Sequence, residues 1–419
     1  MTAIIPASDL GALLRSMGGA SCDLIGQILA AAQNHLDANL SFLAEFQGDL
    51  KVIRRVVSDG SPALLAEGQC LPLQATYCYR VVRGELPNAI CDAHADLRVS
   101  ALPITEQLDI GAYVGVPVLL PDGRVFGTLC CVKTRADPTL DQRDVKFMRV
   151  LGDLIGVQLA RDAAATEDRR QKTTRIQAWI ETGPRMVFQP IIELESGRIV
   201  GVESLARFDA DPARTPDRWF AEAWEVGLGV ELELAAVRAA IADPGPLPEG
   251  AYLTVNASPA TLLSQAFSDA VQGIAPEQLV VEVTEHAVVE AYEPLIEAVE
   301  RLAERGIRLA VDDAGAGYSG LCHILRVAPR LVKLDLMLTR GIHDDPVKQA
   351  LVTAVVGFAS HMRIDLVAEG IETREDAAAL RRLGVPFGQG FYLGEPGPLP
   401  MALRRTDRNR DPDRRPSVH

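Results

Sequence analysis

IVGVE, at residues 199–203, is the first of six short apolar runs that each end in a carboxylate, an amide or a lysine. The others are YLTVN at 252–256, LVVE at 279–282, RLAVDD at 308–313, RLVK at 330–333 and DLVAE at 365–369. The stretches between them have helical character, at 217–242, 259–272, 287–305, 345–362 and 373–383. A buried strand has no structural reason to end on an ionisable side chain. The repeated pattern predicts an α/β chain with a (β/α)₈-type barrel and a site at the carboxyl ends of its strands.

Length and charge narrow the class of protein. A chain of 419 residues is expected to hold roughly two or three domains. Its formal net charge of −14 gives no long-range attraction for nucleic acid, so DNA is not expected as a partner. An anionic ligand is still compatible with this charge if metal ions reverse the local potential.

Targeting signals and disulfides are not expected. No basic-then-apolar leader and no apolar run long enough to span a membrane is seen, so we expect a cytoplasmic protein without membrane insertion. Seven cysteines, an odd number without C-x-x-C spacing, indicate reduced thiols. We interpret the neighbouring Cys130 and Cys131 as packing residues.

The first half reads as a separate α+β domain at residues 20–163. LSFLAEF followed by KVIRRVV predicts one hairpin, and AYVGVPVLL with a Pro-Asp-Gly turn and VFGTLCCVK predicts a second. A helix without proline or turn residues follows, and its part at 164–182 connects to the barrel at 183–400. This helix is either a dimer contact or a solvated linker. The charged stretch 401–419 is predicted to be a disordered tail.

The polar strand ends suggest a metal site. Asp312 and Asp313 would repel each other unless cations lie between them and their neighbours, and a carboxylate shared by two divalent ions is a common arrangement in phosphodiester cleavage. Glu203, Asn256 and Glu282 add hard oxygen ligands of the kind that Mg²⁺ or Mn²⁺ prefers.

Three further residues complete the expected site. Glu369 would hold a metal or accept a proton from water, Lys333 would orient that water or stabilise phosphate charge, and Arg207 would contact a phosphate oxygen. Any one of them alone is equally explained by a rim salt bridge. The G-x-G-x-x-G pattern at 315–320 is rejected as a dinucleotide site, because Asp312 and Asp313 would oppose a pyrophosphate.

These residues lie in segments that resemble the EAL domain family, the phosphodiesterases that hydrolyse cyclic di-GMP to linear pGpG. The matching segments are FQPIIELESGRIVGVESLARF, LTVNAS, VVEVTE, LAVDDAGAGYSG, LVKLD, VAEGIET and GQGFYLGEP. The resemblance covers roughly residues 183–398 and implies a modified (β/α)₈ barrel.

The resemblance also assigns roles to single residues. It implies two metal ions, Mg²⁺ or Mn²⁺, held by Glu203, Asn256, Glu282, Asp312 and Asp313. Lys333, Glu369 and Asp313 would be catalytic, with Asp312 bridging the ions. Substrate-binding positions would be Arg207, Gln189, Leu205 and Gln389, and Glu285 and Glu372 would support the loop after Asp313.

Three departures from the family pattern stand near the expected site. Ser204 replaces the alanine of the signature, and the loop DDAGAGYSG carries Ala314 and Ala316 where active members usually have an aromatic residue and a threonine. No metal ligand is missing.

The first half is similar to GAF sensory domains through YCYRVVRGELPNAICDA and IGAYVGVPVLLPDGRVFGTLCCV. The N-K-x-F-x₃-D-E signature of cyclic-nucleotide-binding members is absent. Cys78 or Cys91 could tether a linear tetrapyrrole, but the Cys-His dipeptide common at such sites is missing. The ligand of this domain is left unknown.

The two resemblances together imply a cyclic di-GMP phosphodiesterase that is regulated by a GAF domain and, like members of the EAL family, acts as a homodimer. Two alternatives stay open. One is a catalytically weak or inactive cyclic di-GMP receptor that signals to a partner protein. The other is a different metal-dependent barrel enzyme, such as an aldolase or another phosphoesterase.

Overall fold

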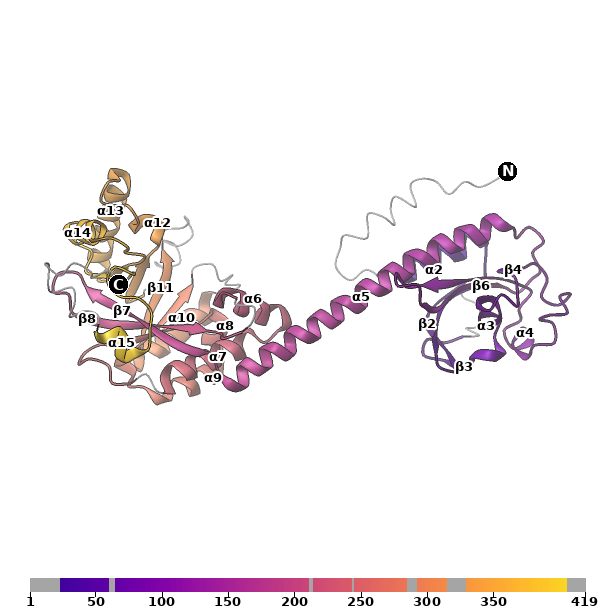
Figure 1. Cartoon of the computed structure of the whole chain (residues 1–419), viewed down its shortest axis with the longest axis horizontal. Coiled ribbons are helices and arrows are strands. Elements are labelled where there is room, and N and C mark those ends of the chain that lie inside the picture. The colour runs from indigo at the N-terminus through magenta and orange to yellow at the C-terminus, as the bar shows by residue number, and fades with distance from the viewer. Residues whose placement is uncertain are drawn as a thin grey trace, which may run out of the picture. The chain divides into compact units, whose positions relative to one another are not determined.

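The computed structural model of the chain describes residues 23–59, 65–210, 214–242, 245–284, 292–314 and 329–404. The chain divides into two compact units, and the boundary lies between Asp168 and Arg169. Figure 1 shows both units and labels many of their elements. Each unit has its own sheet and its own buried core, so each is described separately.

The first unit is built on a six-stranded antiparallel sheet in the order β3-β2-β1-β6-β5-β4. Both predicted hairpins are present, because β1 pairs with β2 and β5 pairs with β6. The strands are β1 (Leu40–Gln47), β2 (Leu50–Ser58), β3 (Cys70–Pro72), β4 (Ala89–Ile90), β5 (Ala112–Leu119) and β6 (Val125–Lys133). The helices are α2 (Leu24–Leu36), the 3₁₀ turn η1 (Leu73–Ala75), α3 (Tyr77–Val82), α4 (Pro103–Gln107) and the start of α5 (Gln142–Thr182).

Both faces of this sheet are covered, as expected for strands with few polar side chains. Helices α2 and α5 pack on one face, where Leu29, Met148 and Cys131 share a cluster. Helices α3 and α4 lie over the opposite face, where Tyr77 and Cys130 are buried together. Neighbouring residues of a strand point to opposite faces, so Cys130 and Cys131 enter different cores.

Helix α5 is the long helix predicted for this stretch. Its first turns are buried against the sheet of the first unit, with Met148 and Ile155 fully covered. Residues 161–171 are exposed. In the second unit, Trp179 of α5 packs on Phe208 and Trp219 with ring centroids 5.3 and 6.0 Å apart. Aromatic edge-to-face contacts of this kind anchor the end of the helix.

The second unit is a closed eight-stranded barrel in the order β10-β11-β12-β13-β14-β7-β8-β9. The predicted modified barrel is confirmed, and the modification is β7, which is antiparallel to both β8 and β14. The other neighbouring pairs are parallel. The strands are β7 (Arg185–Glu193), β8 (Ile199–Arg207), β9 (Tyr252–Asn256), β10 (Leu279–Thr284), β11 (Arg308–Ala314), β12 (Leu331–Leu334), β13 (Asp365–Ala368) and β14 (Phe387–Gly388).

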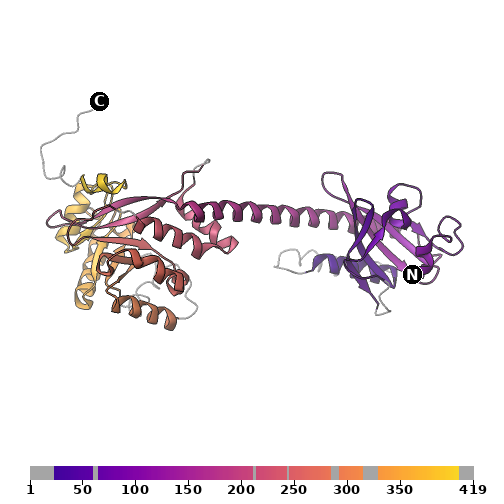
Figure 2. The same cartoon turned by 90° about the horizontal axis from the view of Figure 1, so that it is seen from below.

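Figure 2 shows the helices that follow these strands around the barrel. They are α6 (Pro216–Val226), α7 (Gly229–Ala242), α8 (Pro259–Leu263), α9 (Gln265–Ala270), the 3₁₀ turns η2 (Val271–Gly273) and η3 (Pro276–Gln278), α10 (Tyr292–Glu304), α12 (Leu336–Thr339), α13 (Pro346–Met362), α14 (Arg374–Arg382) and α15 (Leu399–Arg404).

Two of the expected helices and the expected start of the C-terminal tail differ from the structure. The helix expected at 217–242 is two helices, because Gly227 adopts a left-handed conformation with φ of 82° and ends α6. The helix expected at 259–272 breaks at Ser264, whose hydroxyl caps α9 by accepting from the Phe267 amide. The segment expected to be a tail from residue 401 begins inside α15, where Leu399 and Ala402 are buried in the barrel core. Residues 405–419 lie outside the described part of the chain.

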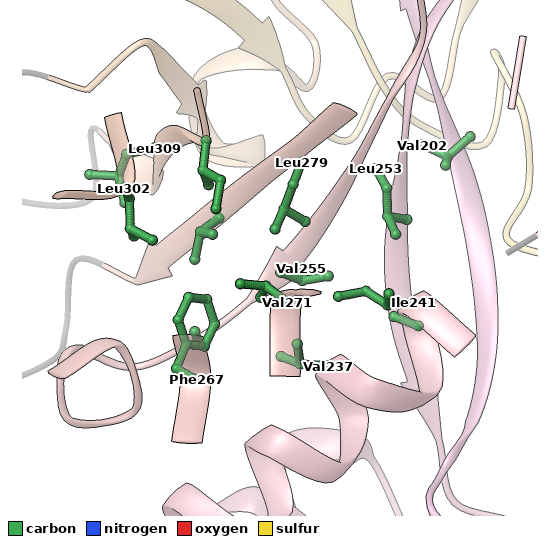
Figure 3. Packing of buried hydrophobic residues seen from close by; sticks show 14 of the residues in the cluster. Val202, Val237, Ile241, Leu253, Val255, Phe267, Val271, Leu279, Leu302 and Leu309 are labelled. Carbon is green, nitrogen blue, oxygen red and sulfur yellow. The ribbon is translucent and has the colours of Figure 1, made fainter. Parts of the chain in front are cut away.

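The barrel core has an outer and an inner part. The outer part packs strand side chains such as Leu253 and Leu279 against helix side chains such as Val237 and Phe267, as Figure 3 shows. The inner part fills the barrel with one side chain from each of seven strands: Ile191, Val200, Tyr252, Val280, Ala310, Leu331 and Val367. In the described residues, no helix is long and apolar enough to cross a membrane.

Two adjacent leucines of α8 offer a test of this packing. Leu262 is buried in the barrel core and Leu263 is 45% exposed. We expect Leu262→Ala to lower the free energy of unfolding of the second unit by about 2–5 kcal/mol, because it removes buried apolar contacts and leaves a cavity. Leu263→Ala should change it by less than about 0.5 kcal/mol.

All three tryptophans (Trp179, Trp219 and Trp224) lie in the second unit, so tryptophan fluorescence in urea reports its unfolding. Equal effects of the two substitutions would contradict the packing described for α8.

Candidate active site

The polar residues predicted at the strand ends form one layer above the inner barrel core. In β10, Glu282 lies two residues after Val280, and in β12, Lys333 lies two residues after Leu331. Asp312 and Glu369 have the same spacing from Ala310 and Val367. Because side chains of a strand alternate between its faces, each of these four residues points into the barrel on top of an apolar one.

Lys333 is the centre of this layer. Its side chain is only 2% exposed, and its ammonium group contacts four carboxylates from four other segments. The distances from Lys333 Nζ are 3.3 Å to Glu203 Oε1, 3.0 Å to Glu282 Oε2, 3.4 Å to Asp312 Oδ1 and 2.6 Å to Glu369 Oε1. One positive charge therefore faces four acidic groups in a site that is largely shielded from water.

This imbalance of charge is reflected in the pKa values of the acids. Burial raises the pKa of Glu282 well above its usual value, although the charge of Lys333 opposes the rise. Burial raises the pKa of Glu369 to about 7, again against the attraction of Lys333. For Glu203, burial acts in the same direction, but Lys333 and a hydrogen bond from Gln389 outweigh it and leave the pKa lowered. The three acids differ because Glu203 has the most hydrogen-bond donors.

Two glutamines hold Glu203 in place. Gln389, directly after β14, donates through Nε2 to Glu203 Oε2 at 2.6 Å and to Gln189 Oε1 at 2.9 Å. Gln189, the neighbour of Glu203 in β7, in turn donates to the Gly394 carbonyl oxygen at 3.0 Å. Asn256 adds a contact of 3.4 Å from Nδ2 to Glu203 Oε1. The predicted positions Gln189 and Gln389 thus lie in the site, where they orient Glu203.

A cavity of about 900 Å³ adjoins this layer. Asn256, Leu205 and Arg207 line it together with residues of α6 that the sequence did not single out, Phe220 and Trp224. Their spacing of four residues places both aromatic side chains on one face of a helix, and this pattern in the sequence could have predicted them as residues of a binding cavity. The cavity is mainly apolar, and it is of the size that holds a small organic ligand.

Arg207 is the cation of this cavity. It is half-buried, and burial lowers the pKa of its guanidinium, as does the charge of nearby Arg185. Its Nη1 donates to the Ala206 carbonyl oxygen at 2.8 Å, which leaves other donors of the group for a ligand. An arginine in an apolar cavity is suited to bind a phosphate.

Three predicted residues, Glu372, Glu285 and Asp313, are not placed in the site by the described contacts. Glu372 is 42% exposed and pairs with Arg340 at 3.0 Å, so the structure shows it in a surface ion pair. Glu285 lies outside the described residues, as do Ala316 and the rest of the loop at 315–328. The backbone of Asp313 lies in β11, but its side chain is not described.

The layer fits divalent cations by its donor chemistry. It gathers carboxylates and an amide, the ligands that Mg²⁺ and Mn²⁺ prefer, and it holds more acidic groups than one lysine can neutralise. Within the described part of the chain, no group of three or more acidic, histidine or cysteine side chains is arranged so that it could hold a metal ion as it stands. The acids are drawn to Lys333 instead.

Comparison with known proteins identifies the family. The model of the EAL domain matches residues 177–396, which is just over half of the chain. The chain belongs to the EAL domain family. The model of the GAF domain matches residues 23–159, so the EAL barrel follows an N-terminal GAF domain.

Relatives and solved structures are consistent with this assignment. A "probable cyclic di-GMP phosphodiesterase PdeG" from Escherichia coli is 30% identical over 223 residues, which are 50% of this chain and 44% of that protein. An "uncharacterized signaling protein" from Caulobacter vibrioides is 27% identical over 379 residues, 86% of this chain and 42% of that protein. The chain spans less than half the length of these two curated relatives.

A solved structure shares the EAL fold. The FimX EAL domain of Xanthomonas citri, solved in complex with c-diGMP, matches with a TM-score of 0.51 at 18% identity. The match covers 57% of this chain and 97% of that one.

The role of Lys333 in stability can be measured. We expect Lys333→Met to destabilise the EAL barrel by about 3–5 kcal/mol in the absence of metal, because the buried carboxylates of Glu203 and Glu282 lose the cation that they contact. Lys172→Met, which removes a surface pair with Glu225, should cost less than about 1 kcal/mol.

Urea unfolding followed by tryptophan fluorescence, with a chelator present, compares the two variants. An unchanged midpoint for Lys333→Met would show that the four carboxylates do not depend on this lysine.

Proposed function

We propose that this protein is a metal-dependent phosphodiesterase that hydrolyses cyclic di-GMP to linear pGpG. The observation that carries the proposal is the layer of four carboxylates around Lys333, next to a cavity that contains Arg207. Such a layer can hold divalent cations, and the cavity offers a cation and aromatic side chains to a phosphate and a base. The relative named PdeG supports the same activity.

Glu203, Asn256, Glu282, Asp312 and Asp313 would hold two ions, Mg²⁺ or Mn²⁺. When bound, the ions would neutralise the dianionic substrate and supply an activated water. Glu369 is suited to accept the proton of the attacking water, because its pKa of about 7 allows it to exchange a proton near neutral pH.

The other residues of the site would bind and orient. Lys333 would stabilise negative charge that develops on the phosphate, and Arg207 would donate hydrogen bonds to a phosphate oxygen. Gln389 would keep the Glu203 carboxylate in one orientation and Gln189 would hold Gln389, a role supported by the hydrogen bonds from Gln389 to both residues. Leu205 would contact the substrate from the wall of the cavity.

The activity is tested by incubating the full chain with cyclic di-GMP and Mg²⁺ or Mn²⁺ and separating the products. We expect pGpG to form, and we expect Glu203→Gln to reduce kcat at least about 100-fold, because a neutral amide replaces an anionic metal ligand. Glu195→Gln is the matched control, since Glu195 is 84% exposed near the other end of the same hairpin.

Each alternative gives a different result. Tight binding of cyclic di-GMP without turnover would overturn the enzyme and identify a receptor. Cleavage of other phosphodiesters with no preference for cyclic di-GMP would identify a different phosphoesterase.

A second prediction separates substrate binding from catalysis. Arg207 and Arg185 are neighbours across the β7–β8 pair, but Arg185 is bound by Asp209 at 3.0 Å and lies outside the cavity. We expect Arg207→Met to raise the KM for cyclic di-GMP by about tenfold or more, the effect of losing a charged hydrogen bond to phosphate.

Arg185→Met should leave KM within about twofold, because it removes only an exposed ion pair. Equal KM values for the two variants would exclude Arg207 from the substrate site.

We further propose that the protein acts in the cytoplasm as a homodimer and that the GAF domain regulates the barrel through α5. The continuity of α5 between the two units supports such coupling.

Sedimentation of the full chain tests whether it is a homodimer. Activity of the full chain that never differs from that of a barrel beginning at residue 169 would contradict the regulation.

A further inference from the structure

Lys51 of β2 is the second fully buried lysine of this chain, with 1% exposure. Its ammonium lies 4.5 Å from the centroid of the Phe42 ring and 3.3 Å from the sulfur of Cys78. Among the described residues, no carboxylate forms an ion pair with it, in contrast to the four acids around Lys333. Burying a positive charge in an apolar core is costly unless a negative charge compensates it. The sulfur of Cys78 is the contact that can carry such a charge.

Other donors converge on the same sulfur. Cys130 Sγ lies 3.4 Å from Cys78 Sγ, and the Tyr113 hydroxyl lies 3.2 Å from Cys130 Sγ and 3.7 Å from Cys78 Sγ. These side chains are at most 2% exposed. Thr128, two residues before Cys130 on β6, has a buried hydroxyl on the same side of the strand, and its interaction with the two sulfurs lowers the pKa of both.

This environment favours the Cys78 thiolate. The hydrogen bond from Cys130 holds the pKa of Cys78 well below its usual value, and the charge of Lys51 acts in the same direction against the effect of burial. The pKa of Cys130 is raised well above its usual value by burial and by its hydrogen bond to Cys78. The two sulfurs are therefore unequal, as in a pair with one nucleophile and one resolving thiol.

We propose that Cys78 and Cys130 form a redox site in the GAF domain, in which a small hydroperoxide oxidises Cys78 and Cys130 closes a disulfide. The proposal is independent of the function assigned to the barrel. It adds a redox role to Cys130, which also packs in the core as expected.

Atoms and electrons are conserved in both steps of this oxidation. The Cys78 thiolate attacks the outer oxygen of the hydroperoxide, a sulfur–oxygen bond forms, the oxygen–oxygen bond breaks, and the leaving oxygen takes a proton and departs as water or an alcohol. Cys78 is now a sulfenic acid, oxidised by two electrons. The Cys130 sulfur then attacks it, the sulfur–sulfur bond forms, and the hydroxyl leaves as water with the Cys130 proton.

Geometry permits the second step. The sulfurs must approach from 3.4 Å to the bond length of about 2.05 Å, a shift that side-chain rotation can supply in part. The bond would join α3 to the central strand β6. Because both sulfurs are buried, a molecule close to water in size should reach them much faster than a bulky reagent.

The other described cysteines serve as internal controls. Cys131 is next to Cys130 but on the opposite face of the sheet, and burial raises its pKa to about 12. Its sulfur contacts Met148 at 3.9 Å, not another thiol. Cys70 is exposed, and Cys91 donates to the Leu140 carbonyl oxygen. None of them is placed to form a disulfide with Cys78 in the described structure.

The test treats the full chain with hydrogen peroxide, blocks free thiols under denaturing conditions and maps peptides by mass spectrometry without reduction. We expect a linked pair of peptides that contain Cys78 and Cys130. Cys131→Ser should form the same link at the same rate. In Cys130→Ser, a sulfenic acid at Cys78 should be trapped when the peroxide-treated protein is unfolded in the presence of a dimedone-type reagent, so that burial does not limit access to the trap.

Lys51→Met tests the source of the reactivity, since the thioether side chain replaces the charge at similar volume. We expect the oxidation of Cys78 at pH 7 to slow at least about tenfold, because the thiolate is the nucleophile and loses its counter-charge. The Cys130→Ser trap stands as an independent test if Lys51→Met does not fold.

The proposal is overturned if peroxide oxidises Cys70 while Cys78 and Cys130 stay reduced. It is overturned as well if Cys78 fails to react with the trap in Cys130→Ser, or if folded Lys51→Met is oxidised at the parental rate.

Discussion

The contact of one buried ammonium, Lys333, with four carboxylates is the interaction on which the site depends. Like charges this close repel each other strongly when water is excluded, and a lysine alone cannot balance four acids. The layer is therefore stable only with protons or further cations. This explains why burial raises the pKa of Glu282 and why that of Glu369 reaches about 7, and it makes the layer receptive to divalent ions.

The barrel makes this crowding possible. The inner part of the barrel core, an apolar plug with one side chain from each of seven strands, lies directly beneath the polar layer. Its side chains cannot easily move aside, because protein interiors are close-packed. Glu282, Asp312, Lys333 and Glu369 each stand two residues beyond a plug residue, so their backbones are fixed by the core. Glu203 is oriented differently. Gln389, directly after β14, donates to its carboxylate, and Gln189 of the antiparallel strand β7 accepts a second hydrogen bond from Gln389. The antiparallel strand β7 thus supplies a side chain that holds Gln389, and Gln389 in turn holds a central acid.

The two buried lysines show how the same residue serves opposite chemistries. Lys333 lies among acids at the rim of a barrel, and Lys51 lies between an aromatic ring and a thiol inside an antiparallel sheet. In both places the ammonium group is shielded from water, and neighbouring groups must compensate its charge. Carboxylates compensate the charge of Lys333, and the sulfur of Cys78 compensates that of Lys51.

The sequence by itself determined the barrel and the set of acids, because apolar runs with polar ends recur at βα spacing and alternation fixes which side chains face inward. It also predicted the hairpins of the GAF domain. The break of the helix at Gly227 and the split at Ser264 were not predicted, since helical periodicity continues across both positions and local capping decides them. Only the tertiary structure decided that Lys333 contacts four acids at once, that Glu372 pairs with Arg340, and that Cys78 contacts both Lys51 and Cys130. These contacts join segments far apart in the chain, and their distances follow from strand register and packing, which no local pattern encodes.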